Sequence, residues 1–290
     1  MNYQKVKLSP GLHFVTTPIG TARDITLRAL DVLASAEVLA AEDTRSLRRL
    51  MDIHGVPLAG RTVIAYHDHS RAGVQERLMA ALGEGRSVAY ASEAGMPLIA
   101  DPGYELARDA AAAGHLVTAA PGVSALTTAL TLAGLATDAV FFGGFLPNAR
   151  AARRARLEQL KQVPGTLVFY ESPKRAAATV SDMAEVLGPD RSAAMCREMT
   201  KKFEEVLRAP LHDLAEQLAD RTLKGEIVLV VDRGGSEKIR ESDLETDLRE
   251  AMRRHSVRDA ADLVARMHDA PKRKVYQMAL RLGTEEADDE

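Results

Sequence analysis

The chain has 290 residues, which is long for one domain and comfortable for two. Its hydrophobic content of 46% supports a large core, whereas 4% aromatic residues and no tryptophan argue against a carbohydrate or stacking platform. A net charge of −3 excludes a globally basic RNA binder, so any nucleic-acid contact must come from local patches.

The single cysteine, Cys196, excludes a disulfide framework or a cysteine-ligated zinc site and fits a reducing compartment. It lies in an apolar run typical of a strand, which favours a buried structural thiol over a reactive one. No apolar run reaches membrane-spanning length, and Met1–Lys7 lacks the hydrophobic region of a secretory signal. These features predict a soluble, cytoplasmic protein without a membrane partner.

The first half of the chain alternates short apolar runs with helical patterns. This alternation predicts a mostly parallel sheet with helices on both faces, in an α/β lobe over residues 11–146. The expected strands are Leu12–Thr16, Val38–Ala41, Thr62–Ala65, Ser87–Ala91, Leu116–Ala119 and Val140–Phe142.

A second lobe is expected over residues 147–235, beginning with a basic helical bridge at 147–164. Two consecutive strands separated by a turn, at Ser192–Arg197 and Glu204–Arg208, indicate an antiparallel hairpin and therefore a mixed sheet. Strands at Thr166–Tyr170 and Ile227–Asp232 complete it. Residues 242–283 are predicted to be all-helical. Between Arg249 and Gly283 the sequence contains nine Lys or Arg residues and four acidic residues.

The segment Ser92–Gly103 connects an expected buried strand to a helix. It contains two glycines, two prolines and two carboxylates, which together make a stiff connection with few bulky side chains. Such a loop at the carboxyl end of a parallel strand is where an α/β protein holds a small ligand. The alternative is a purely structural loop.

Two other strand-to-helix loops have a similar character. Thr16–Gly20 closes the first strand, and Pro121–Ala125 follows the fifth. Neither contains the G-x-G-x-x-G fingerprint or a P-loop, which argues against nucleotide di- and triphosphates. Either loop can wall a cavity, and either can equally be an ordinary turn with a helix cap.

Glu42 and Asp43 follow the second strand beside Arg45. Adjacent carboxylates next to a guanidinium suit a polar substrate or a general base. The alternative is that Asp43 or Thr44 caps the next helix while Glu42 pairs with Arg45. Further along, His67-Asp68-His69 could suggest a metal, but nothing else supplies a spaced set of ligands, so a polar cleft wall is favoured over a metal site.

Charged groups also stand at strand ends of the second lobe, in Phe169–Arg175, Arg197–Lys202 and Lys224–Glu226. Each of these segments could be an exposed turn with solvated charges. Together they favour convergence on one cleft.

These loops, in this order, resemble the tetrapyrrole methylase superfamily, and more closely its ribosomal RNA branch of cytidine 2′-O-methyltransferases. The resemblance covers residues 11–232 densely and extends through the C-terminal helices. The matching segments are Thr17–Gly20 with Asp24–Thr26, Ala41–Arg45, His67–His69, Ser92–Gly103, Pro121-Gly122, Gly144–Pro147, Phe169–Arg175, Arg197-Glu198 with Thr200-Lys201, and Lys224–Glu226. The chain departs from the pattern at Glu93, where the family usually has Asp, and at Met96, where it has Thr.

The resemblance implies a two-lobed α/β fold, with one parallel and one mixed sheet, plus a small all-helical C-terminal extension. It also implies S-adenosylmethionine in the cleft and methyl transfer to a ribose hydroxyl of small-subunit ribosomal RNA, free or in the assembled subunit. By position, the cofactor would contact Pro18, Glu93, Ala94, Gly95, Pro97, Ile99, Ser124, Ala125, Glu171, Ser172 and Gly225.

A hydroxyl is a poor nucleophile near neutral pH, so a base or polarising cation would assist the transfer. The candidate catalytic residues are Glu42, Asp43, Glu198 and Lys201, with Lys201 or an acid near it expected to assist deprotonation.

Two basic patches suit RNA phosphates despite the negative net charge. One lies in the bridge at Arg150, Arg153 and Arg154, and the other in the C-terminal helices at Lys272, Arg273 and Lys274. The resemblance also implies a homodimer. Two other functions stay open: methylation of a tetrapyrrole such as a corrin precursor, and RNA binding by a degenerate member without catalysis.

Overall fold

The computed structural model describes residues 2–67, 72–233, 241–267 and 270–288, which form two compact units, Met1–Asp232 and Arg233–Glu290. The larger unit contains two five-stranded sheets. No helix in the described ranges combines the length and apolar character needed to cross a lipid bilayer.

The first sheet has the strand order β3-β2-β4-β1-β5 and is parallel throughout, as predicted. Its strands are β1 (Gly11–Val15), β2 (Val38–Ala41), β3 (Val63–Ala65), β4 (Ser87–Ala91) and β5 (Val117–Ala120). Parallel strands are buried on both faces, which explains why β1, β2 and β4 are apolar runs without alternation.

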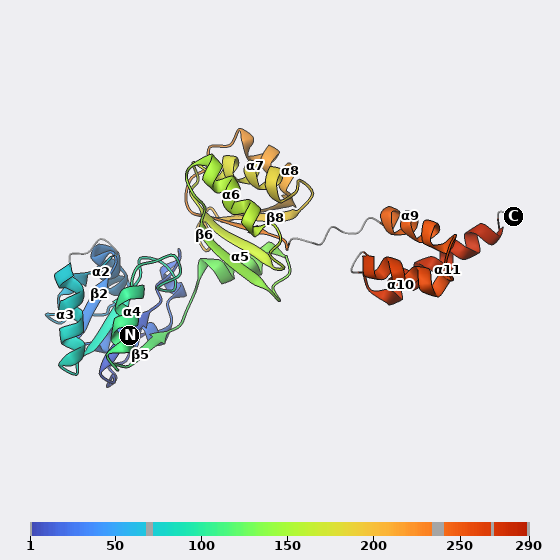
Figure 1. The fold of residues 1–290 in the computed structure, drawn as a ribbon. Helices are drawn as coiled ribbons and strands as arrows, with labels where there is room; N and C mark the ends of the chain where they lie inside the picture. The colour runs from blue at the N-terminus through green and yellow to red at the C-terminus, as the bar shows by residue number, and fades with distance from the viewer. Residues whose placement is uncertain (1, 68–71, 234–240, 268–269, 289–290) are drawn as a thin grey trace. The chain divides into compact units, whose positions relative to one another are not determined.

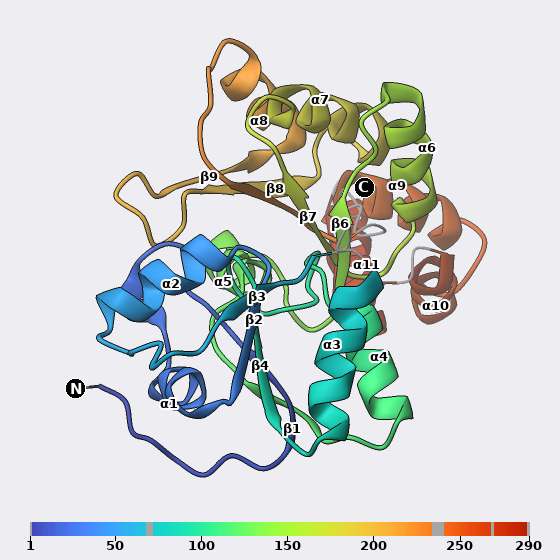
Figure 2. The same cartoon turned by 90° about the vertical axis from the view of Figure 1, so that its left-hand side faces the viewer.

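Four helices cover this sheet (Figures 1 and 2). Helices α1 (Leu27–Ser35) and α2 (Thr44–Ile53) bury leucines and alanines against one face. Helices α3 (Ala72–Gly83) and α4 (Tyr104–Ala112) cover the other face. A short 3-10 helix, η1 (Ala22–Asp24), precedes α1.

The second sheet has the order β6-β7-β10-β8-β9 and is mixed, as predicted. Strands β6 and β7 are parallel, and every other neighbouring pair is antiparallel. The strands are β6 (Val140–Phe145), β7 (Thr166–Glu171), β8 (Ser192–Arg197), β9 (Glu205–Pro210) and β10 (Ile227–Val231).

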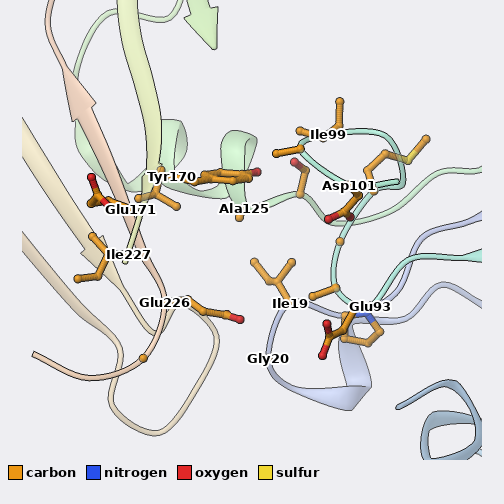
Figure 3. Close-up of a pocket in the computed structure, with 18 of the residues that line it drawn as sticks. Ile19, Gly20, Glu93, Ile99, Asp101, Ala125, Tyr170, Glu171, Glu226 and Ile227 are labelled. Atoms are coloured by element: carbon orange, nitrogen blue, oxygen red, sulfur yellow. The ribbon is translucent and has the colours of Figure 1, made fainter. Parts of the chain in front are cut away.

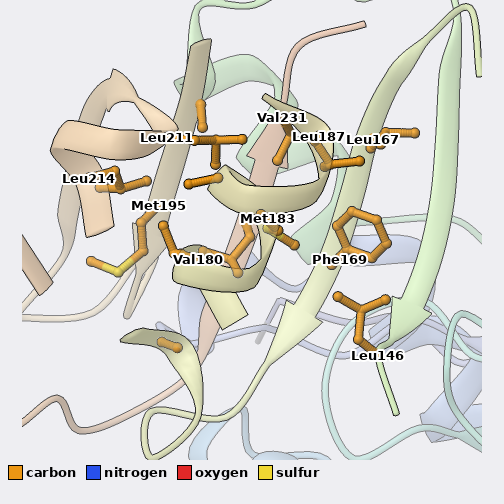
Figure 4. Packing of buried hydrophobic residues seen from close by; sticks show 14 of the residues in the cluster. Leu146, Leu167, Phe169, Val180, Met183, Leu187, Met195, Leu211, Leu214 and Val231 are labelled. Carbon is orange, nitrogen blue, oxygen red and sulfur yellow. The ribbon is translucent and has the colours of Figure 1, made fainter. Parts of the chain in front are cut away.

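The two faces of this sheet carry different layers. Helices α6 (Arg150–Leu160), α7 (Ala176–Leu187) and α8 (Leu211–Ala219) pack on one face around Phe169 and Met183 (Figure 4). Helix α5 (Ala125–Ala133) packs on the other through the small side chains Ala129 and Ala133. Cys196 lies fully buried under α5, and burial raises the pKa of its thiol to about 11, which confirms a structural thiol.

The expectation that the strand at 140–142 belongs to the first lobe is wrong. This strand, β6, is the edge of the second sheet, and α5 before it packs on that sheet too. An apolar stripe on a helix does not specify which sheet it covers, so hydrophobic periodicity could not reveal this. We therefore place the division between the lobes after β5 rather than after residue 146.

The smaller unit is all-helical, with α9 (Glu241–Met252), α10 (Val257–Met267) and α11 (Lys272–Asp288). Its own core is built around Leu248, Val264 and Val275. This agrees with the helical extension predicted for residues 242–283.

Candidate functional site

A cavity of about 630 Å³ lies in the larger unit, where the carboxyl ends of β1, β2 and β4 meet the ends of β6 and β7 and the start of β10 (Figure 3). The loops at the ends of parallel strands share one edge of the sheet, so segments far apart in the chain converge there. The lining residues are Pro18, Ile19, Gly20, Glu42, Ser46, Glu93, Ala94, Gly95, Met96, Ile99, Ala100, Asp101, Ser124, Ala125, Phe145, Tyr170, Glu171, Ser172, Pro173, Lys201, Gly225, Glu226, Ile227 and Val228.

All the residues predicted to contact a cofactor line this cavity, except Pro97. Pro97 is instead buried behind the loop, where it stiffens the backbone without facing the cavity. Three strand-end loops of the first lobe, after β1, β4 and β5, and three strand-end segments of the second lobe thus contribute to one site.

The loop after β4 is held in a fixed shape. Thr17 and Gly95 exchange two backbone hydrogen bonds of 3.1 and 3.0 Å, and Ser92 donates its hydroxyl to the Gly95 carbonyl at 2.6 Å. Leu98 and Ala100 both adopt left-handed backbone conformations, with φ of 70° and 60°. Such conformations are costly for residues other than glycine and persist only when the surroundings enforce them.

This loop presents Asp101 to the cavity (Figure 3). The Asp101 carboxyl makes no hydrogen bond or ion pair with any residue that the structure describes. Burial raises its pKa to about 7, with a further contribution from the negative charges of Glu42 and Glu93. Burial also raises the pKa of Glu93, assisted by Glu42, Asp43 and Glu226.

Acidic side chains therefore outnumber basic ones in the lining of the cavity. Among the residues that the structure describes, the lining has one cation, Lys201, and the acidic side chains of Glu42, Glu93, Asp101, Glu171 and Glu226. Two of these carboxylates, Glu93 and Asp101, make no hydrogen bond or ion pair with a residue that the structure describes, and they favour a cationic ligand, because such a ligand would relieve the mutual repulsion.

The two adjacent carboxylates after β2 have different roles. Asp43 caps α2, accepting hydrogen bonds from the backbone N–H groups of Arg45 at 2.7 Å and Ser46 at 3.3 Å. The side-chain hydrogen bond from Arg45, followed by these backbone bonds, lowers the pKa of Asp43 to about 2. Asp43 does not line the cavity, whereas Glu42 does and accepts the Glu93 N–H at 3.2 Å.

Lys201 lies at the cavity in a double ion pair, with its Nζ 2.9 Å from Glu198 Oε1 and 2.8 Å from Glu226 Oε2. Partial burial acts to lower the pKa of Lys201, but the hydrogen bonds to Glu226 and Glu198 outweigh it and raise the pKa. An ammonium with a raised pKa is a poor proton acceptor. The geometry favours a charge-stabilising role for Lys201 over the deprotonation expected from the sequence.

Glu198 stabilises the segment that contains Lys201 and does not line the cavity. It adopts a left-handed φ of 50°, and its Oε1 accepts hydrogen bonds from Lys201 Nζ and the Glu226 N–H. The hydrogen bond from Lys201 lowers the pKa of Glu198 against the opposing effect of burial. Glycine suits position 225 because its φ of 89° is left-handed, and a Cβ there would also lie 2.3 Å from the Glu198 carboxylate.

The predicted RNA patch on α6 is wrong for Arg153. This side chain is only 5% exposed and pairs with the buried carboxylate of Asp182, at 2.6 Å between Nη2 and Oδ2. Arg150 and Arg154 also pair with Asp182 and with Glu185. These arginines neutralise a buried acid between α6 and α7, a partner that the sequence pattern did not reveal. Lys272, Arg273 and Lys274 are exposed on α11, as an RNA surface requires.

Two residues of the histidine segment, Asp68 and His69, lie outside the described residues. Among the residues with assigned positions, no group of three or more His, Cys, Asp or Glu side chains is arranged to hold a metal ion.

Sequence reasoning missed several lining residues. Asp101 belongs to the loop that was singled out, Glu226 to the Lys224–Glu226 segment, and Phe145 to the Gly144–Pro147 segment. Each was therefore signalled by its segment, but nothing local indicated that its side chain turns into the cavity. Tyr170 was signalled in the same way by the segment at the end of β7.

Comparisons with known proteins give a consistent result. Residues 11–215 match the family model for Tetrapyrrole (Corrin/Porphyrin) Methylases, and residues 240–283 match that for the RsmI C-terminal HTH domain. A relative from Mesorhizobium japonicum named ribosomal RNA small subunit methyltransferase I is 44% identical over 276 residues, covering 95% of this chain and 93% of the relative.

Solved structures share the fold at low sequence identity. Diphthine synthase superposes with a TM-score of 0.59 at 15% identity, covering 76% of this chain and 89% of that one. Uroporphyrin-III C-methyl transferase from Thermus thermophilus, complexed with S-adenyl homocysteine, gives a TM-score of 0.53 at 20% identity, covering 76% of this chain and 96% of that one.

Proposed function

The chain belongs to the ribosomal RNA small subunit methyltransferase I family, among the tetrapyrrole methylases, and from this premise we propose that it methylates the 2′-hydroxyl of a cytidine. It is an S-adenosylmethionine-dependent methyltransferase that acts on ribosomal RNA. The observation that carries the proposed site is the acidic cavity at the strand ends, which Asp101 faces without a hydrogen-bond or ion-pair partner among the described residues.

The cavity fits S-adenosylmethionine in size and charge. About 630 Å³ is within the range of pockets that enclose ligands of this size. The cofactor carries a sulfonium and an α-ammonium group, and the unpartnered carboxylates of Glu93 and Asp101 suit such cations. The residues we propose to hold it are Pro18, Glu93, Ala94, Gly95, Ile99, Asp101, Ser124, Ala125, Glu171, Ser172 and Gly225.

When bound, S-adenosylmethionine supplies a methyl group that is already a strong electrophile, so the protein has mainly to align the acceptor and remove its proton. Of the four catalytic candidates, Glu42 lines the cavity and neither caps a helix nor forms an ion pair within the described part of the chain. We assign Glu42 as the proton acceptor. Lys201, beside the cavity, would stabilise negative charge on the acceptor oxygen or a neighbouring phosphate.

We also propose that the enzyme is a homodimer and that it works in the cytoplasm. The dimer is supported by exposed apolar side chains near the edges of the two sheets, at Leu116, Val117 and Val140. Light scattering in solution should give twice the mass of one chain, and the mass of a single chain would contradict the dimer.

The test of the proposed reaction uses methyl-labelled S-adenosylmethionine with small-subunit ribosomal RNA and, separately, with assembled small subunits. Alkaline cleavage of RNA needs a free 2′-hydroxyl, so label on the ribose should appear in alkali-resistant dinucleotides, with cytidine on the 5′ side. Label in mononucleotides would indicate base methylation and contradict the proposal.

A tetrapyrrole added as a competing acceptor tests whether the enzyme methylates tetrapyrroles instead of RNA. Transfer of label to uroporphyrin III instead of RNA would contradict an RNA acceptor. Binding of RNA without any transfer, although S-adenosylmethionine binds, would point to the non-catalytic alternative.

A further inference from the structure

The end of β6 contains a β-bulge beside the cavity. In the pairing of β6 with β7, Phe142 lies opposite Val168 and Gly144 lies opposite Phe169. Gly143 is therefore an extra residue without a partner in the ladder. Bulges reverse the alternation of side chains that follow them, and they recur next to active sites.

The bulge determines which face Phe145 occupies. Before it, Phe141 packs on the α6–α8 face of the sheet and Phe142 on the α5 face. Uninterrupted alternation would direct residue 145 to the same face as Phe141. With the bulge, Phe145 lies opposite Tyr170 and lines the cavity, its ring centroid 5.7 Å from that of Tyr170 in an edge-to-face arrangement.

Both glycines of the bulge are required by the geometry. A Cβ on Gly143 would lie 2.4 Å from the Phe169 ring, and Gly144 adopts a left-handed φ of 61°. Glycine in a strand loses the most conformational freedom on folding, so this pair does not favour the stability of β6. Its effect is to turn one aromatic ring from a core face to the cavity.

The Phe145 ring is largely exposed to solvent. The Phe145 side chain is 60% exposed, although it lines the cavity and touches an aromatic neighbour. A ring that served only the core would be buried, so the exposed face of Phe145 is available to a ligand. An exposed aromatic face beside the cavity suits a flat group that arrives from solvent.

We propose that Phe145 stacks on the nucleobase of the nucleotide whose ribose is methylated, and so positions the 2′-hydroxyl at the cavity. This inference rests on the proposed function and names the part of the RNA that the cavity receives. Stacking on an aromatic ring needs the base to be unpaired, so the acceptor nucleotide must be single-stranded or turned out of its helix.

Two variants of the full-length protein separate stacking from packing. Phe145→Leu keeps the apolar bulk and removes the ring, whereas Phe145→Tyr keeps the ring. With small-subunit ribosomal RNA as acceptor, Phe145→Leu should raise KM for the RNA about tenfold, equivalent to ~1.4 kcal/mol and within the range of base–aromatic stacking. Phe145→Tyr should stay within about twofold of wild type, because it preserves the stacking face.

Calorimetric titration with S-adenosylmethionine is the second measurement. Its Kd should be unchanged in both variants, and both should melt at the wild-type temperature, since the side chain is largely exposed. Wild-type KM for RNA in Phe145→Leu would overturn the proposal. So would a weakened Kd for S-adenosylmethionine with unchanged RNA kinetics, because the ring would then contact the cofactor. A wild-type enzyme that labels no RNA would instead overturn the proposed function itself.

Discussion

Glu42 and Asp43 are neighbours in sequence, yet only one of them is available for chemistry. The Asp43 carboxylate is occupied by hydrogen bonds that cap α2, and its pKa of about 2 makes it a weak base. Glu42 faces the cavity. We expect Glu42→Gln to lower kcat by about a hundredfold or more, the usual contribution of a positioned proton acceptor. Single-turnover transfer of labelled methyl to RNA measures this directly.

Asp43→Asn is the matched control for Glu42→Gln. Asparagine caps helices about as well as aspartate, so this variant should keep both its stability and its turnover. Full turnover with an unchanged pH profile in Glu42→Gln would show that the proton goes elsewhere.

Asp101 predicts a pH dependence of cofactor binding. Its pKa of about 7 in the ligand-free protein means that it is partly protonated near neutral pH. A cationic ligand stabilises the ionised form, so binding lowers this pKa and releases protons. Affinity for S-adenosylmethionine should therefore rise with pH until Asp101 is fully ionised, and then level off. Calorimetry at several pH values, in buffers of different ionisation enthalpy, measures both the affinity and the proton release.

Asp101→Asn should weaken binding and abolish this pH dependence. The raised pKa also means that ionising Asp101 costs folded-state stability as the pH rises from the unfolded value toward about 7. The ligand-free variant should therefore unfold at a higher temperature than wild type above neutral pH. Persistent proton release in the variant would show that another group, such as Glu93, is responsible.

At the scale of elements, the connection between α6 and α7 depends on a buried carboxylate. Asp182 accepts from Arg150 and Arg153, and the hydrogen bonds from these arginines lower its pKa against the effect of burial. Asp182→Ala would leave Arg153 buried without its carboxylate partner, which typically destabilises by about 3–5 kcal/mol. Denaturant unfolding measures the loss.

Arg154→Ala, on α6, provides the comparison within the same network of ion pairs. Its side chain is partly exposed and its ion pairs are screened by solvent, so the cost should be at most about 1 kcal/mol. Equal losses in the two variants would mean that the network is not organised around the buried Asp182–Arg153 pair.

The sequence predicted the strands and strand-end loops because these have local signals. Apolar runs such as Ser87–Ala91, bounded by glycine and proline, mark a buried strand and the loop that follows it. No comparable local signal in the sequence shows which sheet a strand joins or a helix packs against. Strand β6 was therefore placed with the wrong sheet, although a strand was expected to begin at Val140.

The orientation of single side chains was the least predictable part of the site. Asp101 turns into the cavity because Leu98 and Ala100 adopt left-handed conformations, and nothing in a leucine or an alanine indicates this. Phe145 does so because of a one-residue register shift that depends on β7. Arg153 was taken for a surface residue because its partner, Asp182, is 29 positions away in sequence.

At the scale of the molecule, the methyl-donor site and the basic cluster proposed to bind RNA phosphates lie in different units. The cavity belongs wholly to Met1–Asp232, whereas the exposed cations Lys272, Arg273 and Lys274 belong to the helical unit with its own core. Lys272 Nζ lies 3.3 Å from Asp262 Oδ1 in an exposed ion pair, which holds this lysine only weakly. Separate cores allow one function to be weakened without disturbing the other.

Replacing Lys272, Arg273 and Lys274 together with alanine should therefore weaken RNA binding and leave the Kd for S-adenosylmethionine unchanged. For each phosphate that the variant no longer neutralises, the slope of log K against log salt should fall by about 0.7–0.9, so three phosphates would reduce it by roughly 2–3. A triple alanine variant at the exposed Lys5, Lys7 and Arg28 removes the same charge from the larger unit and controls for net charge. If both triple variants flatten the slope equally, the effect is one of overall charge. If neither does, RNA binds to cationic residues elsewhere, and the helical unit has another role.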